Sequence, residues 1–506
     1  MATCSDGTMR TRRQLLAGAM TVAVGLLTAC GSSGQTASAT VAATNPTGTG
    51  QSSTATSTIG TGQAGGATGT ARGSTAAATT TNATRTATNS ITATATAAGA
   101  APQATNGHLT IWHASGTQTI ASKTLDGLIH DFQAQNPTIQ ADHVVSSSTS
   151  SNNFEKLTAS MAGGEPPDVM SIDVIWPAAL VAKQAIRPLD SYLNSKQTSA
   201  TGPLLSDYYP GPLDACTIAQ KTYALPYETS GLLLFYNQDM FRVAGLDPTT
   251  ALATWSSFRE AAVQLTRRSG TTFEQMGFLI PRASLEWRMY TFAPFVWQAG
   301  GDFVNADGTK DTFNQAPGVA AAQFWTDLVI KDQVTALKQP ANLFETGKAG
   351  IYIQGPGDIV RLTQLKLPFA FGTALLPKQQ TAASDTGGWN WSIASQSKRA
   401  DQAWTWLEWS GRVAQLVRWS LAVGAVPPRK SARDTKEWQD LVTAQPTWKA
   451  ALDTLAIQRT RPKLVRYTDW SPIVSNGLEQ AVSGATAVQQ ALDTAARLAD
   501  AVLTQS

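Results

Sequence analysis

The stretch that most constrains the fold is residues 221–246, KTYALPYETSGLLLFYNQDMFRVAGL. Two β-prone runs in it, 222–225 and 231–236, are separated by Pro226 and by residues 227–230. Proline fixes its own φ and pushes the preceding residue out of the helical region, so both runs are expected to be extended and nearly continuous. This pattern predicts a segment that crosses from one lobe to another. One ordinary strand interrupted by a bulge is the alternative interpretation.

The segment that follows residue 107 begins with alternating strands and helices. Residues 109–112 predict a strand, 119–135 an amphipathic helix, and 139–145 a second strand. A third strand is expected at 168–172. This β-α-β order predicts a parallel sheet and an α/β fold.

The second half of the chain is expected to return to the first lobe. Residues 387–394, GGWNWSIA, predict a second crossing strand. Residues 400–419 predict one helix, and the apolar face of 480–503 predicts another. After the first crossing, Asn237 is expected to cap a short helix that ends at Gly245.

Polar and aromatic residues follow two of the predicted parallel strands. His113 and Ser115 come after the first strand, and Asp173 and Trp176 come after the third. Ligands in open α/β sheets collect outside the carboxyl ends of the strands, so these four residues are candidates for a ligand cleft. A structural histidine, an ion-paired or capping aspartate and a packed tryptophan are the alternatives, which the sequence leaves open.

The first 30 residues have the features of a bacterial lipoprotein signal peptide. Three arginines precede an apolar run at 15–27, which is too short for an ordinary transmembrane span, and residues 27–30 form an acceptable lipobox. We expect cleavage before Cys30 and acylation, which would anchor the protein outside the cytoplasm. The adjacent Arg12 and Arg13 are compatible with twin-arginine and with general secretory export.

Residues 31–106 are rich in Thr, Ala, Gly and Ser, so they cannot bury a core and are expected to form a disordered tether. The first 106 residues hold five of the 38 basic and one of the 35 acidic residues. The remainder, with 33 basic and 34 acidic residues, is nearly neutral. This charge balance gives no reason to expect a nucleic-acid partner.

No motif for a cofactor, a metal or a nucleophile is found. Cys216 is the one cysteine beyond the signal peptide, so no disulfide framework is expected, and the four histidines lack metal-ligand spacing. Ala349 follows Gly347 and Lys348 where a phosphate loop needs Ser or Thr. We therefore expect no catalytic residues, no bound metal and no cofactor.

Residues 226–246 resemble the hinge strand of the extracellular solute-binding proteins, family 1, of sugar-importing ABC transporters. Further segments match that family in the same order: GGEPPDV, FNQAPGVAAA, FETGKAGIYIQGPG, TGGWNWSIA and GAVPPR. Each piece alone has weak specificity, but the ordered set is specific and covers essentially all of residues 107–506.

The resemblance implies a two-lobe, type II periplasmic-binding-protein fold with two or three hinge crossings. One lobe would hold about 107–227 and 389–440, and the other about 229–386 and 446–506. By analogy, a ligand binds between the lobes and hinge closure buries it. The loaded protein, expected to be a monomer, would then contact the transmembrane subunits of an ABC permease, with ATP hydrolysis in separate subunits.

A sugar site needs aromatic surfaces for the C–H faces of the rings, and carboxylates and amides for the hydroxyl groups. The resemblance implies a hydroxyl-binding carboxylate at Glu228 and a ring-stacking aromatic near Trp470. Core packing for each tryptophan, a salt bridge or cap for Glu228, and tight turns for the glycines are the alternatives. Besides the four strand-end residues, the candidates for ligand binding are Glu228, Trp297, Gly355, Gly357, Trp389, Trp391, Tyr467 and Trp470.

The sequence therefore favours a binding protein that captures a carbohydrate for an ABC importer. A phosphorylated or acidic solute such as glycerol phosphate is the first alternative, and it would require a cleft arginine such as Arg282 or Arg288. A secreted glycan-acting enzyme is the less favoured alternative, because carboxylates and aromatic rings also build glycosidase clefts.

Overall fold

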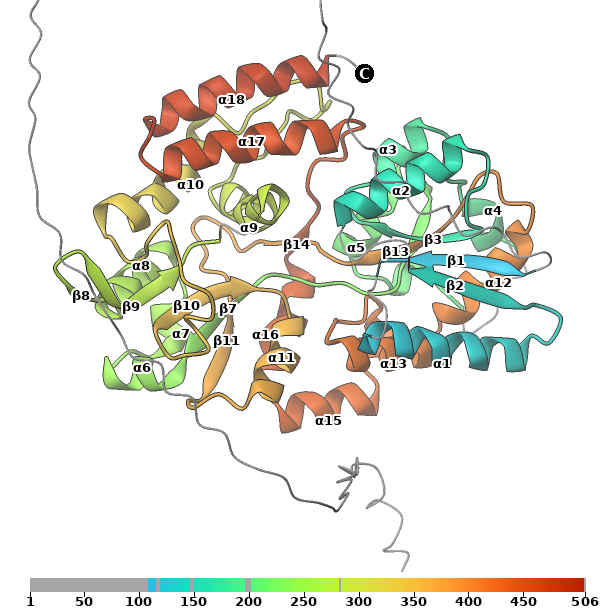
Figure 1. The fold of residues 1–506 in the computed structure, drawn as a ribbon, viewed down its shortest axis with the longest axis horizontal. Helices are drawn as coiled ribbons and strands as arrows, with labels where there is room; N and C mark the ends of the chain where they lie inside the picture. Colours follow the sequence, from blue (N-terminus) through green and yellow to red (C-terminus); the bar gives the residue numbers. More distant parts are fainter. Residues whose placement is uncertain (1–107, 115–118, 146–149, 196–201, 282–283, 505–506) are drawn as a thin grey trace, which may run out of the picture. The chain divides into compact units, whose positions relative to one another are not determined.

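The computed structural model describes residues 108–114, 119–145, 150–195, 202–281 and 284–504, which all lie in one compact unit. The predicted signal peptide, Cys30 and the tether lie outside the described residues. The described chain forms two five-stranded sheets with helices packed on them (Figure 1). The predicted α/β class with two lobes is confirmed.

The first sheet has the strand order β2-β1-β3-β13-β6. β1 pairs in parallel with β2 and β3, which confirms the predicted β-α-β unit, whereas β13 runs antiparallel to β3 and β6. The strands are β1 (Leu109–His113), β2 (Ala141–Val145), β3 (Val169–Asp173), β6 (Ala224–Pro226) and β13 (Trp389–Ile393).

Helices cover both faces of the first sheet because its side chains alternate between two buried clusters. Ile111 packs with α1, α12 and α13, whereas its neighbour Trp112 packs on the opposite side with α2 and α3 (Figure 1). Thr119 caps α1 by accepting a hydrogen bond from the amide of Ser122. The helices are α1 (Ile120–Gln135), α2 (Ser150–Ala162), α3 (Pro177–Ala182), α12 (Ala400–Ser410) and α13 (Val413–Val423).

The second sheet has the order β11-β7-β10-β9-β8. Its strands are β7 (Leu233–Asn237), β8 (Arg267–Ser269), β9 (Thr272–Leu279), β10 (Ala349–Gln354) and β11 (Phe371–Leu375). The helices that pack with it include α6 (Gln238–Val243), α8 (Trp255–Gln264), α9 (Leu285–Gln298), α10 (Ala316–Thr326), α11 (Gly357–Leu365), α17 (Tyr467–Val482) and α18 (Val488–Leu503). Asn237 caps α6, as predicted, by accepting from the amide of Met240.

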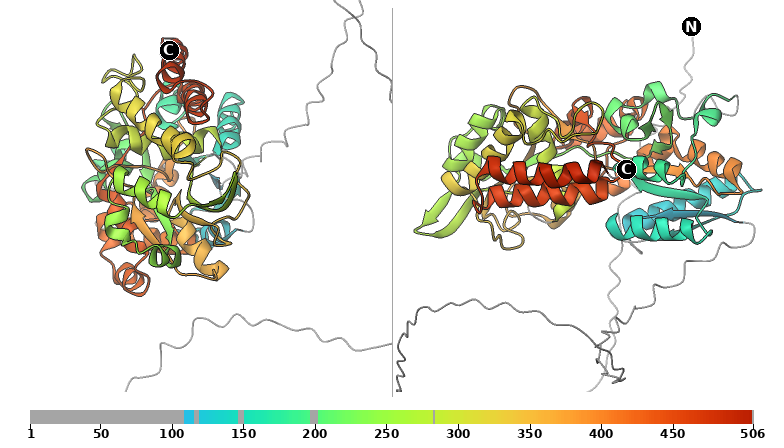
Figure 2. Two further views of the ribbon diagram at one scale, coloured as in Figure 1. Left: turned by 90° about the vertical axis from the view of Figure 1, so that its left-hand side faces the viewer. Right: turned by 90° about the horizontal axis from the view of Figure 1, so that it is seen from above.

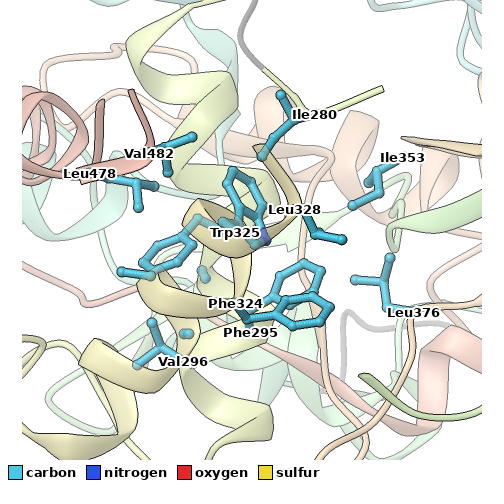
Figure 3. Packing of buried hydrophobic residues seen from close by; sticks show 14 of the residues in the cluster. Ile280, Phe295, Val296, Phe324, Trp325, Leu328, Ile353, Leu376, Leu478 and Val482 are labelled. Atoms are coloured by element: carbon cyan, nitrogen blue, oxygen red, sulfur yellow. The ribbon is translucent and has the colours of Figure 1, made fainter. Parts of the chain in front are cut away.

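The largest apolar core lies between the second sheet and the helices α8 to α10, α17 and α18. Figure 3 shows Trp325 of α10 close to Phe295 and Val296 of α9 and to Leu478 and Val482 of α17. The ring centroids of Trp325 and Phe295 are 5.4 Å apart in an edge-to-face arrangement. This core fixes α9 against the sheet.

The stretch around Pro226 does cross from one sheet to the other. β6 ends at Pro226 in the first sheet, and β7 begins at Leu233 in the second, so the alternative of one bulged strand is wrong. The returning segment lies beside it: Ser230 and Gly387 exchange backbone hydrogen bonds of 3.0 and 2.8 Å. A third passage pairs β12 (Ser384–Asp385) in parallel with β14 (Gln458–Arg459).

Two predicted helices are each divided in two. The predicted helix at 400–419 is α12 and α13, because Arg412 adopts an extended backbone, with φ −68° and ψ 152°, between them. The predicted helix at 480–503 is the end of α17 and all of α18. Gly484, with φ 72°, lies in the left-handed region that ends a helix. α17 and α18 then lie side by side (Figures 1 and 2).

One part of the expected first lobe packs with the second sheet instead. Trp438 of α15 (Lys436–Ala444) is buried in one cluster with Leu233 and Phe235 of β7 and with Trp448 of α16 (Trp448–Asp453), which was expected in the second lobe. Residues near 440 therefore lie with the second lobe, because their apolar side chains cover its sheet. The shorter elements are α4 (Asp190–Leu193), α5 (Pro210–Ala215), α7 (Pro248–Ala251), α14 (Lys430–Arg433), β4 (Thr217–Ile218) and β5 (Lys221–Thr222).

Candidate functional site

A cleft of about 450 Å³ lies beside the crossing segments and is lined by residues of both lobes. The first lobe contributes the end of the crossing strand, the start of β13 and the end of α13. The second lobe contributes the start of α9 and the turn after β10. The polar and aromatic residues in the lining are Glu228, Ser230, Trp287, Tyr290, Gln354, Asp358, Trp389 and Trp419.

Glu228 is the carboxylate at the crossing. Its Oε2 accepts a hydrogen bond of 2.6 Å from the indole N–H of Trp419. Burial raises the pKa of Glu228 to about 7, although the indole hydrogen bond favours the charged form. Among the described residues that line the cleft there is no Lys, Arg or His to neutralise this group. Glu228 can therefore accept a hydrogen bond from a ligand hydroxyl.

The second carboxylate in the lining, Asp358, is already engaged. Its Oδ2 accepts a hydrogen bond of 2.6 Å from the hydroxyl of Tyr352, and its Oδ1 pairs with Arg361 Nε at 2.6 Å. The two carboxylates therefore differ in environment, with one ion-paired and the other beside an indole.

Four aromatic side chains provide flat surfaces in the cleft. Trp287 and Tyr290 lie one helical turn apart on α9, with ring centroids 5.5 Å apart. The hydroxyl of Tyr290 donates to the carbonyl oxygen of Ser230 at 3.1 Å, which ties α9 to the crossing segment. Trp389 and Trp419 line the side that belongs to the first lobe.

The backbone after β10 approaches the cleft through two glycines. A Cβ on Gly355 would find its nearest neighbour, Ser230 Cβ, at 4.0 Å, and one on Gly357 would meet only the carbonyl oxygen of Gly424 at 3.9 Å. Neither glycine has a positive φ. Neither packing within the protein nor backbone conformation requires glycine at these positions, which favours close approach to a ligand over a tight turn.

Four of the predicted site residues lie together in this cleft: Glu228, Gly355, Gly357 and Trp389. Trp176 lies directly behind it, buried, with its ring edge-on to Trp389 at 5.7 Å. Trp391 lies on the same strand face as Trp389 but two residues deeper, stacked on Tyr227 at 4.4 Å. Neither buried tryptophan belongs to the lining of the cleft, and Trp176 packs against Trp389 from within the first lobe.

The structure does not bring Trp297, Tyr467 and Trp470 to the cleft. All three are buried in the core of the second lobe, because α9 and α17 turn these faces toward each other and toward α10. Their polar atoms are satisfied there. Trp297 donates to Asp302 at 3.2 Å, Tyr467 to Glu286 at 2.9 Å, and Trp470 to Asp311 at 2.8 Å.

The other predicted residues at strand ends, His113, Asp173 and Ser115, do not join the described lining of the cleft. His113 is buried with its Nε2 2.8 Å from His143 Nδ1, and burial and His143 lower the pKa of His113 to about 4. Asp173 ends β3 opposite Trp389 and accepts from the amide of Ile175 at 3.3 Å. Neither belongs to the lining of the cleft. Ser115 lies outside the described residues.

Sequence reasoning missed Trp287, Tyr290 and Trp419. Trp419 lies in a helix and is mostly buried although it lines the cleft, so its position in the sequence does not distinguish it from a packing residue. The three-residue spacing of Trp287 and Tyr290 is the one signal that was available, because it puts both rings on one face of α9.

The geometry agrees with comparisons with known proteins. The model of the bacterial extracellular solute-binding protein family matches residues 115–414. A cyclic α-maltosyl-1,6-maltose binding protein from Arthrobacter globiformis is 26% identical, with a TM-score of 0.69 over 79% of this chain and 99% of that one. The sn-glycerol-3-phosphate-binding periplasmic protein of Shigella dysenteriae is 23% identical over 76% of this chain and 90% of its own length.

UgpB from Mycobacterium tuberculosis, solved in complex with glycerophosphocholine, has the same fold, with a TM-score of 0.69 over 79% of this chain and 99% of that chain and 23% identity. This is the type II periplasmic-binding-protein fold. In the part of the chain that the structure describes, no helix has the length and apolar character needed to cross a membrane. Taken with the two sheets, the crossing segments and the cleft between them, the family match shows that the chain belongs to the bacterial extracellular solute-binding proteins.

Proposed function

We propose that this protein binds a neutral carbohydrate in the cleft and delivers it to the permease of an ABC importer. The observation that carries the proposal is the composition of the lining. Three tryptophans and a tyrosine offer surfaces for sugar rings, and Glu228, Ser230 and Gln354 offer hydrogen-bonding groups for hydroxyls. The Arthrobacter globiformis relative, named for binding a maltose-derived cyclic sugar, has the same architecture.

A phosphorylated or acidic solute fits this lining less well, although relatives are named for glycerol phosphate and glycerophosphocholine. An anion would lie close to Glu228 with no cation from the described lining beside it. This alternative requires a cleft arginine such as Arg282 or Arg288, and Arg288 is buried and pairs with Glu479 at 2.8 Å. Arg282 lies outside the described residues.

A glycan-acting enzyme is disfavoured by the state of the carboxylates. A glycosidase needs two carboxyl groups that act on the same bond. Asp358 is committed to Tyr352 and Arg361, which leaves Glu228 without an obvious partner. Members of this family are binding proteins.

The attachment to the membrane is part of the proposal. Acylation of Cys30 would hold the protein at the outer side of the cell membrane, and residues 31–106 would act as the tether. The protein is proposed to act as a monomer. Cys30→Ala is expected to release the protein into the medium, and continued membrane attachment of this variant would contradict the lipid anchor.

A thermal-shift screen of the purified protein with mono- and oligosaccharides, glycerol phosphates and amino acids tests the ligand class. A ligand at one hundred times its Kd adds about 2.7 kcal/mol to the free energy of unfolding, which raises Tm by several degrees. A shift with sugars, without turnover on long incubation, supports the proposal. A shift only with phosphorylated or acidic compounds overturns it in favour of the first alternative, and released products overturn it in favour of an enzyme.

A further inference from the structure

Arg461 is a buried arginine that comes directly after the third passage between the sheets. It follows β14, its side chain is 5% exposed, and it is absent from the lining of the cleft. Its Nε lies 2.9 Å from Oδ2 of Asp385 in β12, and its Nη1 pairs with Oε1 of Glu286 in the first turn of α9. One guanidinium therefore connects the third passage to the helix that carries Trp287 and Tyr290 into the cleft.

The guanidinium also lies against the ring of Tyr290. The distance from Arg461 Cζ to the centroid of this ring is 5.0 Å, which is within the range of a cation–π contact. The hydroxyl of the same ring donates to the carbonyl oxygen of Ser230 in the crossing segment, and the ring lines the cleft. Tyr290 is therefore held at two places, by Arg461 at its face and by the crossing segment at its hydroxyl.

The acidic side chains that surround Arg461 come from both lobes. Burial lowers the pKa of the guanidinium, but the acidic side chains raise this pKa by more, so the group stays charged; they are Asp385, Tyr467, Glu286 and Asp173. Asp173 ends β3 in the first sheet, whereas α9 and α17 of the second lobe carry Glu286 and Tyr467. Loss of the guanidinium would leave the fully buried Asp385 without this cation, which is costly for a carboxylate out of contact with water.

We propose that Arg461 is a positioning residue of the cleft, which fixes the ring of Tyr290 and the start of α9 against the crossing segments without contacting the ligand. The side chains that contact a ligand must be held in one geometry by the residues behind them, and Arg461 is placed to do this. Through Glu286 the same residue holds Trp287, the next residue along α9. The inference rests on the proposed carbohydrate function and extends it to a residue outside the lining.

Titration calorimetry and urea unfolding of the purified protein test this role with two matched variants, and the probes are maltotriose and mannotriose. Arg461→Gln is expected to lower the urea midpoint and to raise Kd about tenfold or more for the sugar that binds. Arg429 provides the control, because it is also buried, pairs with Asp207 at 2.7 Å and lies 5.9 Å from the ring of Tyr208, but none of these residues lines the cleft. Arg429→Gln should lower the urea midpoint and leave Kd within about threefold of the original value.

A double variant separates the positioning role from stability. Asp385→Asn removes the buried charge that Arg461 compensates, so Arg461→Gln combined with Asp385→Asn should recover much of the urea midpoint. Its Kd should stay at the raised value, because Glu286 and Tyr290 still lack the guanidinium.

Three results would each overturn the positioning role and leave the carbohydrate function intact. They are an unchanged Kd in Arg461→Gln, an equal rise of Kd in Arg429→Gln, and a recovery of Kd together with the urea midpoint in the double variant. If the original protein binds neither these two sugars nor any other sugar of the thermal-shift screen, the proposed function and this inference are both wrong.

Discussion

At the scale of single residues, burial in the cleft changes the ionisation of Glu228. Its pKa of about 7 in the folded protein exceeds the value of 4.5 for an unperturbed glutamate. The folded state therefore binds more protons than the unfolded state between these values, and this group lowers the free energy of unfolding as pH rises from about 4.5 to 7. Below pH 4.5 the ionisation of Glu228 does not change the free energy of unfolding. Above pH 7 it lowers that free energy by its full amount.

Glu228→Gln is expected to remove the loss of stability that is caused by burying the ionised carboxylate. The variant should gain stability over the original protein at pH 8, by at most about 3 kcal/mol, and the gain should shrink toward pH 5. Urea unfolding of both proteins at pH 5 and 8 gives the difference in their free energies of unfolding at each pH. The contributions of the other titrating groups cancel in this difference. A difference that does not change with pH would contradict the raised pKa. Sugar affinity should fall in the variant, because the amide is a weaker acceptor than the carboxylate.

The glycines near the cleft offer a second comparison at this scale. Gly355→Ala is expected to leave the free energy of unfolding within about 0.5 kcal/mol of the original value, because its Cβ has room, while ligand affinity falls. Gly424→Ala should instead lose about 1–2 kcal/mol of stability, because Gly424 has φ 74° and its Cβ would lie 2.8 Å from Val360. Urea unfolding and titration calorimetry of both variants separate the two effects, and equal stability losses would argue against a ligand role for Gly355.

At the scale of elements, the crossing segment could be predicted because its signal is local. Pro226 forces extended backbone, and the two runs beside it are too apolar for a surface loop. The division of the helix at Arg412 was harder to see, since arginine is not a helix-breaking residue, whereas Gly484 is of the residue type that commonly ends a helix. The partners of a helix in the folded protein decide where it ends as much as its own sequence does.

The side of each helix that faces the cleft could not be predicted for the same reason. Trp470 and Trp287 both lie near helix N-termini in aromatic segments, and only the packing of α9 against α17 buries one and leaves the other partly exposed. On β13 the direction of Trp389 follows from strand alternation and was accessible from sequence. Strand alternation alone did not define the site either, because Trp391 shares that face without lining the cleft and the strand residues His113 and Asp173 lie outside the lining.

Trp389 lines the cleft and Trp470 is buried in the core, so substitutions of these two tryptophans are expected to have opposite effects on sugar binding and on stability. Trp389→Ala should weaken sugar binding at least tenfold, because it removes a flat surface of the cleft. Trp470→Phe should leave binding unchanged but lower the free energy of unfolding by about 1–3 kcal/mol, since Asp311 loses the indole donor at 2.8 Å in a buried site. Titration calorimetry and urea unfolding on both variants test this. Loss of binding in Trp470→Phe with unchanged stability would place Trp470 at the ligand.

At the scale of the whole described unit, the cleft depends on two lobes connected by paired crossing segments. The hydrogen bonds between Ser230 and Gly387 and between Thr229 and Val426 keep these segments together, so a rotation of one lobe against the other would be concentrated beside Glu228. The proposed ligand site and the hinge then share residues. If the proposed site is correct, the energy of ligand contacts with Glu228 and the aromatic rings is available to stabilise a closed arrangement of the lobes.

Closure is expected to appear as a smaller radius of gyration on ligand binding. Small-angle X-ray scattering of the purified protein, with and without the sugar found in the thermal-shift screen, measures it. Trp389→Ala at a sugar concentration below its own Kd is the control, and it should scatter like the unliganded protein. If saturating sugar leaves the radius of gyration unchanged while calorimetry shows full occupancy, the lobes bind without closing. The cleft contacts would then contribute to affinity without favouring the closed arrangement, because a ligand shifts a conformational equilibrium only when it binds one of the two states more tightly.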